Sequence, residues 1–384
     1  MERLFYADPY IKEFYANVKQ CTPSQNKYQI ILDRTAFFPE SGGQSCDVGF
    51  IGDAEVLHVD EQAGQVVHYT KKSVSIGEKV FCSIDWERRF HNMQNHTGEH
   101  IVSGVIFKKI GYNNVGFHLS DKEVTLDVNG ELEKDNIHQI EYTANEIAVK
   151  NVPVVAWYPS AEELPFIHYR SKLDLVENVR IVSIGEYDSC ACCAPHVSKT
   201  GEIGMIKLLD FVRYKGGTRI HMKCGFDALS DYNEKYQNVR KISTLLSANQ
   251  SQTAEAVKDI LANVSDLKKE KSILRKRYID MRLKQPDCTG TNVCIVEEYL
   301  DINDLRQMVN TGMVNCSGIF AVFSKIKDYE YLYVCGSKNK NVVSFMNQMN
   351  SVLSGKGGGN DKMVQGTVYA TESEIRHFFG GINV

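Results

Sequence analysis

The pattern of hydrophobic and polar residues changes along the chain and predicts four regions. The first, residues 1–88, contains short apolar runs of strand length, at 28–33, 56–59, 66–69 and 79–84, with Gly and Asp between them. Such punctuation is typical of hairpins and meanders. We therefore expect a β-rich, barrel-like domain at the start of the chain.

The second region, residues 89–226, has a mixed pattern. Residues 88–110 contain no Pro and carry apolar residues at helical spacing, a strand is expected at 124–128, and a second helix is expected near 133–149. This order predicts a domain in which helices pack on a sheet.

The third region, residues 227–286, has the pattern of long helices. Alternating steps of three and four separate the following residues: Val257, Ile260, Val264, Leu267, Lys271, Leu274, Tyr278 and Met281. This is a heptad seam with one polar position. A further apolar stripe lies upstream, and polar residues at 247–253 separate the two. We predict a helical hairpin or a dimerising coiled-coil arm that ends at Pro286.

The fourth region, residues 287–384, returns to an α/β pattern. Strands are predicted at 319–323 and 331–335, and a helix at 342–353, before a glycine-rich run that we interpret as a loop. The whole chain is thus expected to be an α+β protein of four parts, and a homodimer could form through the arm or this last domain.

Composition and charge narrow the function classes. The chain has 384 residues, of which 43% are hydrophobic and 24% charged, so it is a globular protein. Its 44 Lys and Arg against 48 Asp and Glu give a net charge of −4, which excludes a protein that coats nucleic acid through overall basic charge. A local basic segment nevertheless lies at 268–284, where eight basic residues stand against Glu270 and Asp280. It is either a solvated helix face or a phosphate-contacting stripe.

The sequence also predicts the cellular compartment of the protein. No apolar run is long enough to cross a bilayer, and residues 1–6 are unlike a signal peptide. The 11 cysteines are an odd number. We expect a cytoplasmic protein whose thiols are packing residues or metal ligands.

Two pairs of residues have the spacing of metal ligands. His96 and His100 are four residues apart, so on a helix their imidazoles lie on one face. Cys192 and His196 form a second pair of the ligand types that zinc prefers. The clustered cysteines could instead be packing residues, and Cys190 and Cys193 compete for the sulfur position. Four protein ligands describe a closed structural zinc site, whereas catalytic sites keep one position open, and both interpretations remain.

These motifs resemble a known family. The His96–His100 and Cys192–His196 pairs, followed by residues 200–204, are similar to the editing domain of alanyl-tRNA synthetases and to the free-standing AlaX editing proteins. The loop at 34–44 and the turn at 216–220 are similar to motifs of the same family, and the run at 355–359 resembles its C-terminal domain. The resemblance covers nearly the whole chain in the order of the long AlaX type.

The resemblance implies a trans-editing hydrolase that uses one Zn²⁺ and removes serine or glycine from mischarged tRNA(Ala). It makes Thr35 a candidate for recognising the serine hydroxyl and Gln44 a candidate for lining the aminoacyl pocket. Glu99 could orient water as a base or support a ligand. The tRNA would be held by the basic helix and the C-terminal domain, with these candidate contacts: Lys268, Lys269, Arg275, Lys276, Arg277 and Lys356.

Three alternatives remain. The chain could edit another tRNA, because threonyl-tRNA synthetases carry a similar pair of motifs. It could be a zinc peptidase, because residues 96–100 fit the H-x-x-E-H pattern with Glu99 as base. It could also be a non-catalytic tRNA-binding protein with a structural zinc.

Overall fold

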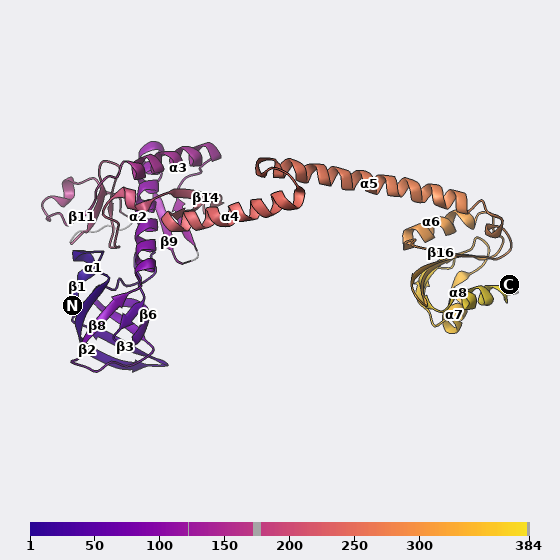
Figure 1. Cartoon of the computed structure of the whole chain (residues 1–384), viewed down its shortest axis with the longest axis horizontal. Helices are drawn as coiled ribbons and strands as arrows, with labels where there is room; N and C mark the ends of the chain where they lie inside the picture. Colours follow the sequence, from indigo (N-terminus) through magenta and orange to yellow (C-terminus); the bar gives the residue numbers. More distant parts are fainter. Residues whose placement is uncertain (122, 172–177, 382–384) are drawn as a thin grey trace. The chain divides into compact units, whose positions relative to one another are not determined.

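The computed structural model describes residues 1–121, 123–171 and 178–381, and the chain forms two compact units, Met1–Lys241 and Ile242–Val384 (Figure 1). Each unit combines helices with β-sheets, which confirms the predicted α+β class. No helix of the described residues is long and apolar enough to span a membrane.

Unit 1 begins with a closed barrel. Its strands run in the order β2-β3-β7-β6-β5-β8. Their bounds are Glu13–Ser24 for β2, Lys27–Leu32 for β3, Gly49–Ile51 for β5, Ala54–Gln62 for β6, Gln65–Thr70 for β7 and Lys79–Ile84 for β8. Buried and exposed positions alternate at the start of β2, where Phe14, Ala16 and Val18 point into the core. Outside the barrel, β1 (Glu2–Arg3) pairs in parallel with β4 (Arg34–Thr35). Helix α1 (Leu4–Ala7) follows β1 in the sequence.

Helix α2 (Trp86–Ile110) follows the barrel and confirms the predicted helix at 88–110. It begins after Asp85, whose side chain accepts a hydrogen bond from the Arg88 amide at 3.1 Å, and it ends at Gly111 with a φ of 85°. Positions 92–106 are buried without exception. Polar residues therefore lie on this helix inside the protein, where each needs a partner.

The rest of unit 1 packs around α2. Helix α3 (Lys134–Val149) and two sheets do so, with strand orders β14-β15-β10-β9 and β11-β12-β13. The strand bounds are Asn114–Leu119 for β9, Val124–Val128 for β10, Val154–Trp157 for β11, Ile181–Ile184 for β12, Asp188–Ala191 for β13, Ile206–Tyr214 for β14 and Gly217–Cys224 for β15. The predicted strand at 124–128 and helix near 133–149 are confirmed.

Two long helices occupy the region predicted as a helical arm. They are α4 (Gly225–Leu246) and α5 (Thr253–Arg282), with a short 3₁₀ turn at Gln250–Gln252 before α5. The apolar seam residues of α5 are exposed in the single chain, from 41% for Val264 to 71% for Met281. The coiled coil and the homodimer stay predictions.

Unit 2 ends in a five-stranded sheet of order β16-β17-β18-β20-β19 with three helices. The bounds are Val293–Glu298 for β16, Ile302–Gly312 for α6, Phe320–Lys327 for β17, Glu330–Gly336 for β18, Val342–Val352 for α7, Lys356–Gly359 for β19, Met363–Tyr369 for β20 and Glu372–Gly380 for α8. The strands expected at 319–323 and 331–335 and the helix at 342–353 are confirmed.

The glycine-rich run is not the predicted loop. Its residues form the edge strand β19, paired antiparallel with β20. A Cβ atom on Gly357 would lie 2.1 Å from the Tyr333 hydroxyl oxygen, so glycine lets the strand pass close to that ring. The prediction of a loop at this run is therefore wrong, because close packing against Tyr333 accounts for Gly357, while the tRNA contact of Lys356 stays a prediction.

Candidate metal centre and active-site cavity

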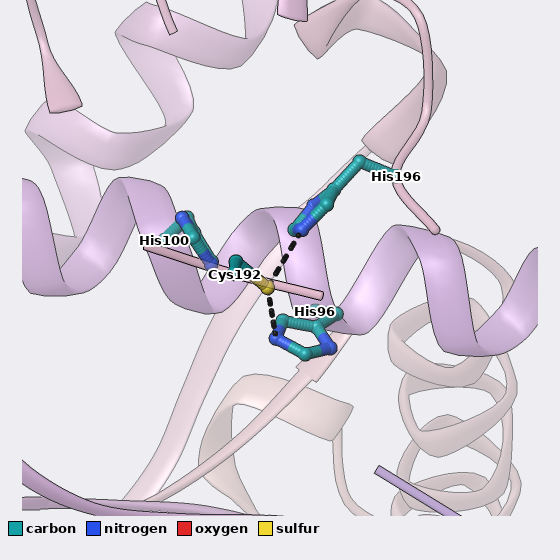
Figure 2. A group of neighbouring side chains, drawn as sticks. All are labelled: His96, His100, Cys192 and His196. Carbon is teal, nitrogen blue, oxygen red and sulfur yellow. Dashed lines mark hydrogen bonds between the residues drawn. The ribbon is translucent and has the colours of Figure 1, made fainter. Parts of the chain in front are cut away.

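The four predicted ligands come together in unit 1. His96 and His100 project from one face of α2, and Cys192 and His196 follow β13 (Figure 2). Their ligand atoms all lie within 4.8 Å of one another. The Cys192 Sγ is 3.5 Å from the His96 Nε2 and 3.3 Å from the His196 Nε2. A tetrahedral zinc would hold sulfur and nitrogen about 3.6 Å apart, so this set of donors fits zinc.

The Nδ1 atom of each histidine forms a hydrogen bond with a supporting side chain. The Nδ1 atoms lie 2.7 Å from Gln44 Oε1 for His96, 3.1 Å from Asp188 Oδ2 for His100 and 3.0 Å from Thr97 Oγ1 for His196. The Thr97 hydroxyl donates to the Met93 carbonyl at 2.7 Å, so it can accept the proton of His196. Because all three Nδ1 atoms are held in this way, the three Nε2 atoms are left for a metal.

The electrostatics of the centre suit a zinc site. Burial works against ionisation of Cys192, but the neighbouring histidines outweigh it and hold the thiol pKa well below its usual range. Burial lowers the pKa of His196 to about 3, so that imidazole is neutral. Burial also acts against protonated His100, yet the hydrogen bonds that its ring donates to Asp188 and Cys192 raise its pKa well above the usual value, so a metal ion at this site would displace a proton from His100. A thiolate and a neutral imidazole are the forms in which these residues bind metal.

Asp188 is itself held in place. The Nε and Nη2 atoms of Arg170 donate to its two oxygens at 2.7 and 2.9 Å. Gly104 makes room for this carboxylate, since a Cβ atom there would lie 2.9 Å from the Asp188 Cβ. No spacing in the sequence marks Arg170 or Asp188, and they are functional residues that the sequence did not indicate.

Replacing Asp188 with Asn should weaken zinc binding. The amide cannot accept a proton from His100 and bind Arg170 as the carboxylate does, so we expect the affinity for zinc to fall about 10- to 100-fold. Competition against a chelator of known affinity would measure this. The exposed Asp210 of β14 provides a control, because Asp210→Asn should leave zinc affinity unchanged. Equal affinities for the wild type and Asp188→Asn would contradict the role of Asp188.

The glycine-containing loop carries Gln44 to the metal centre. Gly42 and Gly43 have φ values of 62° and 82°, and a Cβ atom on Gly43 would lie 2.2 Å from the Phe117 carbonyl oxygen. The Leu119 amide donates to the Gly43 carbonyl at 2.7 Å, which docks the loop on β9. Gln44, predicted to line the aminoacyl pocket, is 1% exposed and supports His96, while its Nε2 has no hydrogen-bond partner among the described residues.

Thr35 has a different environment from the one predicted. It is fully buried, and its hydroxyl lies 2.8 Å from the Nε2 of His68. The His68 Nδ1 lies 3.0 Å from the Ile30 carbonyl, and burial lowers the pKa of His68 to about 4. The neutral ring therefore donates from Nδ1 and accepts at Nε2, so the Thr35 hydroxyl donates to it. Thr35 also accepts a hydrogen bond from the Phe37 amide at 3.1 Å.

A cavity of about 970 Å³ opens onto the metal centre. His96, His100, Cys192 and Glu99 line it, whereas Thr35 and Gln44 are not among the lining residues. Other lining residues are Arg3, Tyr6, Tyr158, Arg170 and Arg180. The volume and the mixture of aromatic and polar side chains suit a small polar ligand group.

The predicted tRNA contacts lie in unit 2 and differ in their surroundings. Lys268, Lys276 and Arg277 are exposed on α5. Lys269 is also exposed and pairs with Asp266 at 3.0 Å. Arg275 instead binds Asp301 and Asp304, the latter at 2.6 Å, so two carboxylates neutralise its charge. Lys356 is exposed at the start of the edge strand β19.

Comparison with known proteins places the chain in a family. Residues 179–223 match the family described as threonyl and alanyl tRNA synthetase second additional domain, and residues 9–88 match tRNA synthetases class II (A). The alanyl-tRNA editing protein AlaX-L of Pyrococcus horikoshii is 32% identical over 98% of this chain and 96% of its own length. The chain belongs to the AlaX-L alanyl-tRNA editing proteins.

More distant relatives agree with this assignment. The alanyl-tRNA editing protein Aarsd1 of Danio rerio is 26% identical over 94% of this chain and 92% of its own length. The alanine–tRNA ligase of Pyrococcus abyssi is 28% identical over 95% of this chain, which corresponds to 42% of that ligase. The AlaX-type chain is thus similar to one part of a larger synthetase and to the whole of free-standing editing proteins.

Proposed function

We propose that this AlaX-L protein hydrolyses the ester bond of seryl-tRNA(Ala) or glycyl-tRNA(Ala) and uses one zinc ion in doing so. The observation that carries the proposal is the His3Cys donor set at the edge of a cavity within a chain of the alanyl-tRNA editing family. His96, His100, Cys192 and His196 would hold the metal. Bound zinc supplies Lewis-acid chemistry at such a site.

The chain's own residues supply the positioning. Gln44, Asp188 and Thr97 fix the three imidazoles, so the geometry of the donors is set before any metal binds. The cavity admits the aminoacyl end, and Glu99 offers a carboxylate beside the metal ligands. The Thr35 hydroxyl donates to His68 and accepts from the Phe37 amide, which leaves one acceptor lone pair for a serine hydroxyl. Recognition of a hydroxyl by hydrogen bonding is what separates serine from alanine, because size alone cannot do so.

Deacylation of seryl-, glycyl- and alanyl-tRNA(Ala) by the purified protein tests the proposal. We expect loss of serine or glycine, little loss of alanine and no activity after chelation. Seryl-tRNA(Thr), the mischarged product of a threonyl-tRNA synthetase, tests whether the protein instead edits the threonine tRNA. Hydrolysis of seryl-tRNA(Thr) in preference to the alanine tRNA would contradict the proposed substrate.

A second candidate is a non-catalytic tRNA-binding protein with a structural zinc. Four protein donors are typical of closed structural sites, whereas catalytic zinc keeps an open position. This candidate predicts metal-dependent stability and tRNA binding without hydrolysis of any charged tRNA. The deacylation assay above therefore separates the two functions.

The exposed basic side chains of α5 are proposed to contact tRNA phosphates. Replacing Lys276 and Arg277 together with Ala should weaken tRNA binding and reduce the slope of log Kd against log salt by about one to two. Filter binding at several salt concentrations would measure both effects. Lys258 pairs with Glu255 at 2.9 Å on the same helix, so Lys258→Ala is a matched control that should change neither value. An unchanged slope in the double variant would remove α5 from the interface.

A further inference from the structure

Glu99 is a buried carboxylate in the cavity. It lies on α2 directly before His100, and the residue is only 3% exposed. Its Oε1 accepts hydrogen bonds from the Ser103 hydroxyl and from Asn114 Nδ2, the latter at 2.6 Å. Both donors are neutral, so neither supplies a positive charge. The second oxygen, Oε2, has no hydrogen-bond partner within the described part of the chain.

The charges that line the cavity are unevenly divided. Among the described residues that line it, Glu99 is the only acidic side chain, whereas three are arginines: Arg3, Arg170 and Arg180. Arg170 directs its Nε and Nη2 to Asp188, and Glu99 acts on this guanidinium only as a further, weaker electrostatic attraction. Arg3 pairs with Glu61 at 2.7 Å, and Arg180 donates to the backbone carbonyls of residues 192 and 194. Among the described lining residues, Glu99 is therefore the carboxylate that a cationic group entering the cavity can bind.

We propose that Glu99 binds the α-ammonium group of the aminoacyl ester, an inference that rests on the proposed function. Apart from the amino acid's side chain, the charged end of an aminoacyl-tRNA brings one cation into the cavity, the α-ammonium, together with anionic phosphates. An ammonium group that leaves water needs acceptors, and a carboxylate oxygen satisfies it through a charge-assisted hydrogen bond. Glu99 thereby anchors a group that serine, glycine and alanine share, and it fixes the ester relative to the metal ligands.

This role differs from that of a general base. A base would act on water and would affect hydrolysis of every ester alike, with or without a free amine. An ammonium-binding residue affects ground-state binding, and only when the amine is present. The two roles therefore separate in a binding experiment that involves no hydrolysis.

The test uses a non-hydrolysable substrate analogue, 3′-(L-seryl)amido-3′-deoxyadenosine, and its N-acetyl derivative. Calorimetry on the zinc-loaded full chain should show that the wild type binds the free amine about 10- to 100-fold more tightly than the acetylated form. In Glu99→Gln we expect this preference to disappear, because the amine analogue then binds as weakly as the acetylated one. The exposed Glu186 offers a matched control, and Glu186→Gln should keep the preference. Zinc content and circular dichroism of each variant check that the fold and the centre persist.

Each outcome decides between the roles. A wild type without preference for the free amine overturns the inference, as does a Glu99→Gln variant that keeps the preference. A Glu99→Gln variant that keeps the preference and loses hydrolysis identifies Glu99 as a base. Hydrolysis of charged tRNA by a wild type that shows no preference sinks the ammonium site alone. Preferential binding of the amine without hydrolysis of any charged tRNA sinks the proposed function and leaves the site.

Discussion

Replacing Cys192 with Ala is expected to remove zinc from the protein and to lower deacylation of seryl-tRNA(Ala) by at least about 100-fold. Loss of an acceptor that only supports a ligand typically costs 10- to 100-fold in metal affinity or activity, and loss of the ligand itself should cost more. Cys192 supplies the sole sulfur of the donor set, and its Sγ lies within 3.5 Å of two imidazole Nε2 atoms. Metal content by mass spectrometry and the initial rate of deacylation measure the two effects.

Two neighbouring cysteines provide the controls for this variant. Cys190 and Cys193 line the same cavity but lie outside the group of residues that could hold the metal. Burial raises the pKa of both thiols, so they are protonated at neutral pH. Cys190→Ala and Cys193→Ala should therefore retain one zinc per chain. Loss of zinc from Cys193→Ala, with retention in Cys192→Ala, would reverse the assignment of the sulfur ligand.

The ligands could be predicted because they follow local rules. His96 and His100 share a helix face through their spacing, and the composition of the Cys192–His196 pair matches zinc chemistry. The helix that carries His96 and His100 follows from the apolar residues at helical spacing in 88–110. This information is contained in short stretches of sequence, and no tertiary contact is needed to read it.

The supporting residues could not be predicted, because they depend on contacts between distant segments. Asp188 reaches His100 across 88 positions of sequence, and Gln44 reaches His96 across 52. His68 has no motif, yet it fixes the hydroxyl of Thr35, which the family resemblance made a candidate for recognising serine. The glycine-rich run failed as a prediction for the same reason. Gly357 is explained by its close approach to Tyr333, a contact that the local sequence does not show.

A buried ion pair joins the loop that carries Gln44 to helix α2. Asp47 and Arg89 are both fully buried. The Arg89 Nε donates to Asp47 at 3.1 Å, and its Nη1 donates to the Pro9 carbonyl at 2.9 Å. The Asp47 carboxylate also accepts from the Phe38 amide at 2.6 Å. The pair therefore connects the segment before β2, the loop and the helix that holds two of the metal ligands.

Replacing Asp47 with Ala should destabilise unit 1 by about 3–5 kcal/mol, because it leaves the Arg89 charge buried without a carboxylate. Urea unfolding followed by tryptophan fluorescence measures this. The chain has two tryptophans, Trp86 and Trp157, and both belong to unit 1, so the signal reports on that unit.

The control for this variant is an ion pair on the surface of the same barrel. Asp53 and Lys72 are 2.9 Å apart and largely exposed, so Asp53→Ala should leave the urea midpoint unchanged. Both variants replace Asp with Ala, so the difference between their urea midpoints reports the cost of leaving the buried Arg89 charge without its carboxylate. If both variants unfold at the same urea concentration, the Asp47–Arg89 pair does not stabilise the fold. The loop would then be held by its other hydrogen bonds, including those of its backbone to β9 and those of Arg88 to Ser45 and Cys46, and Asp47→Ala would leave the zinc affinity set through Gln44 intact.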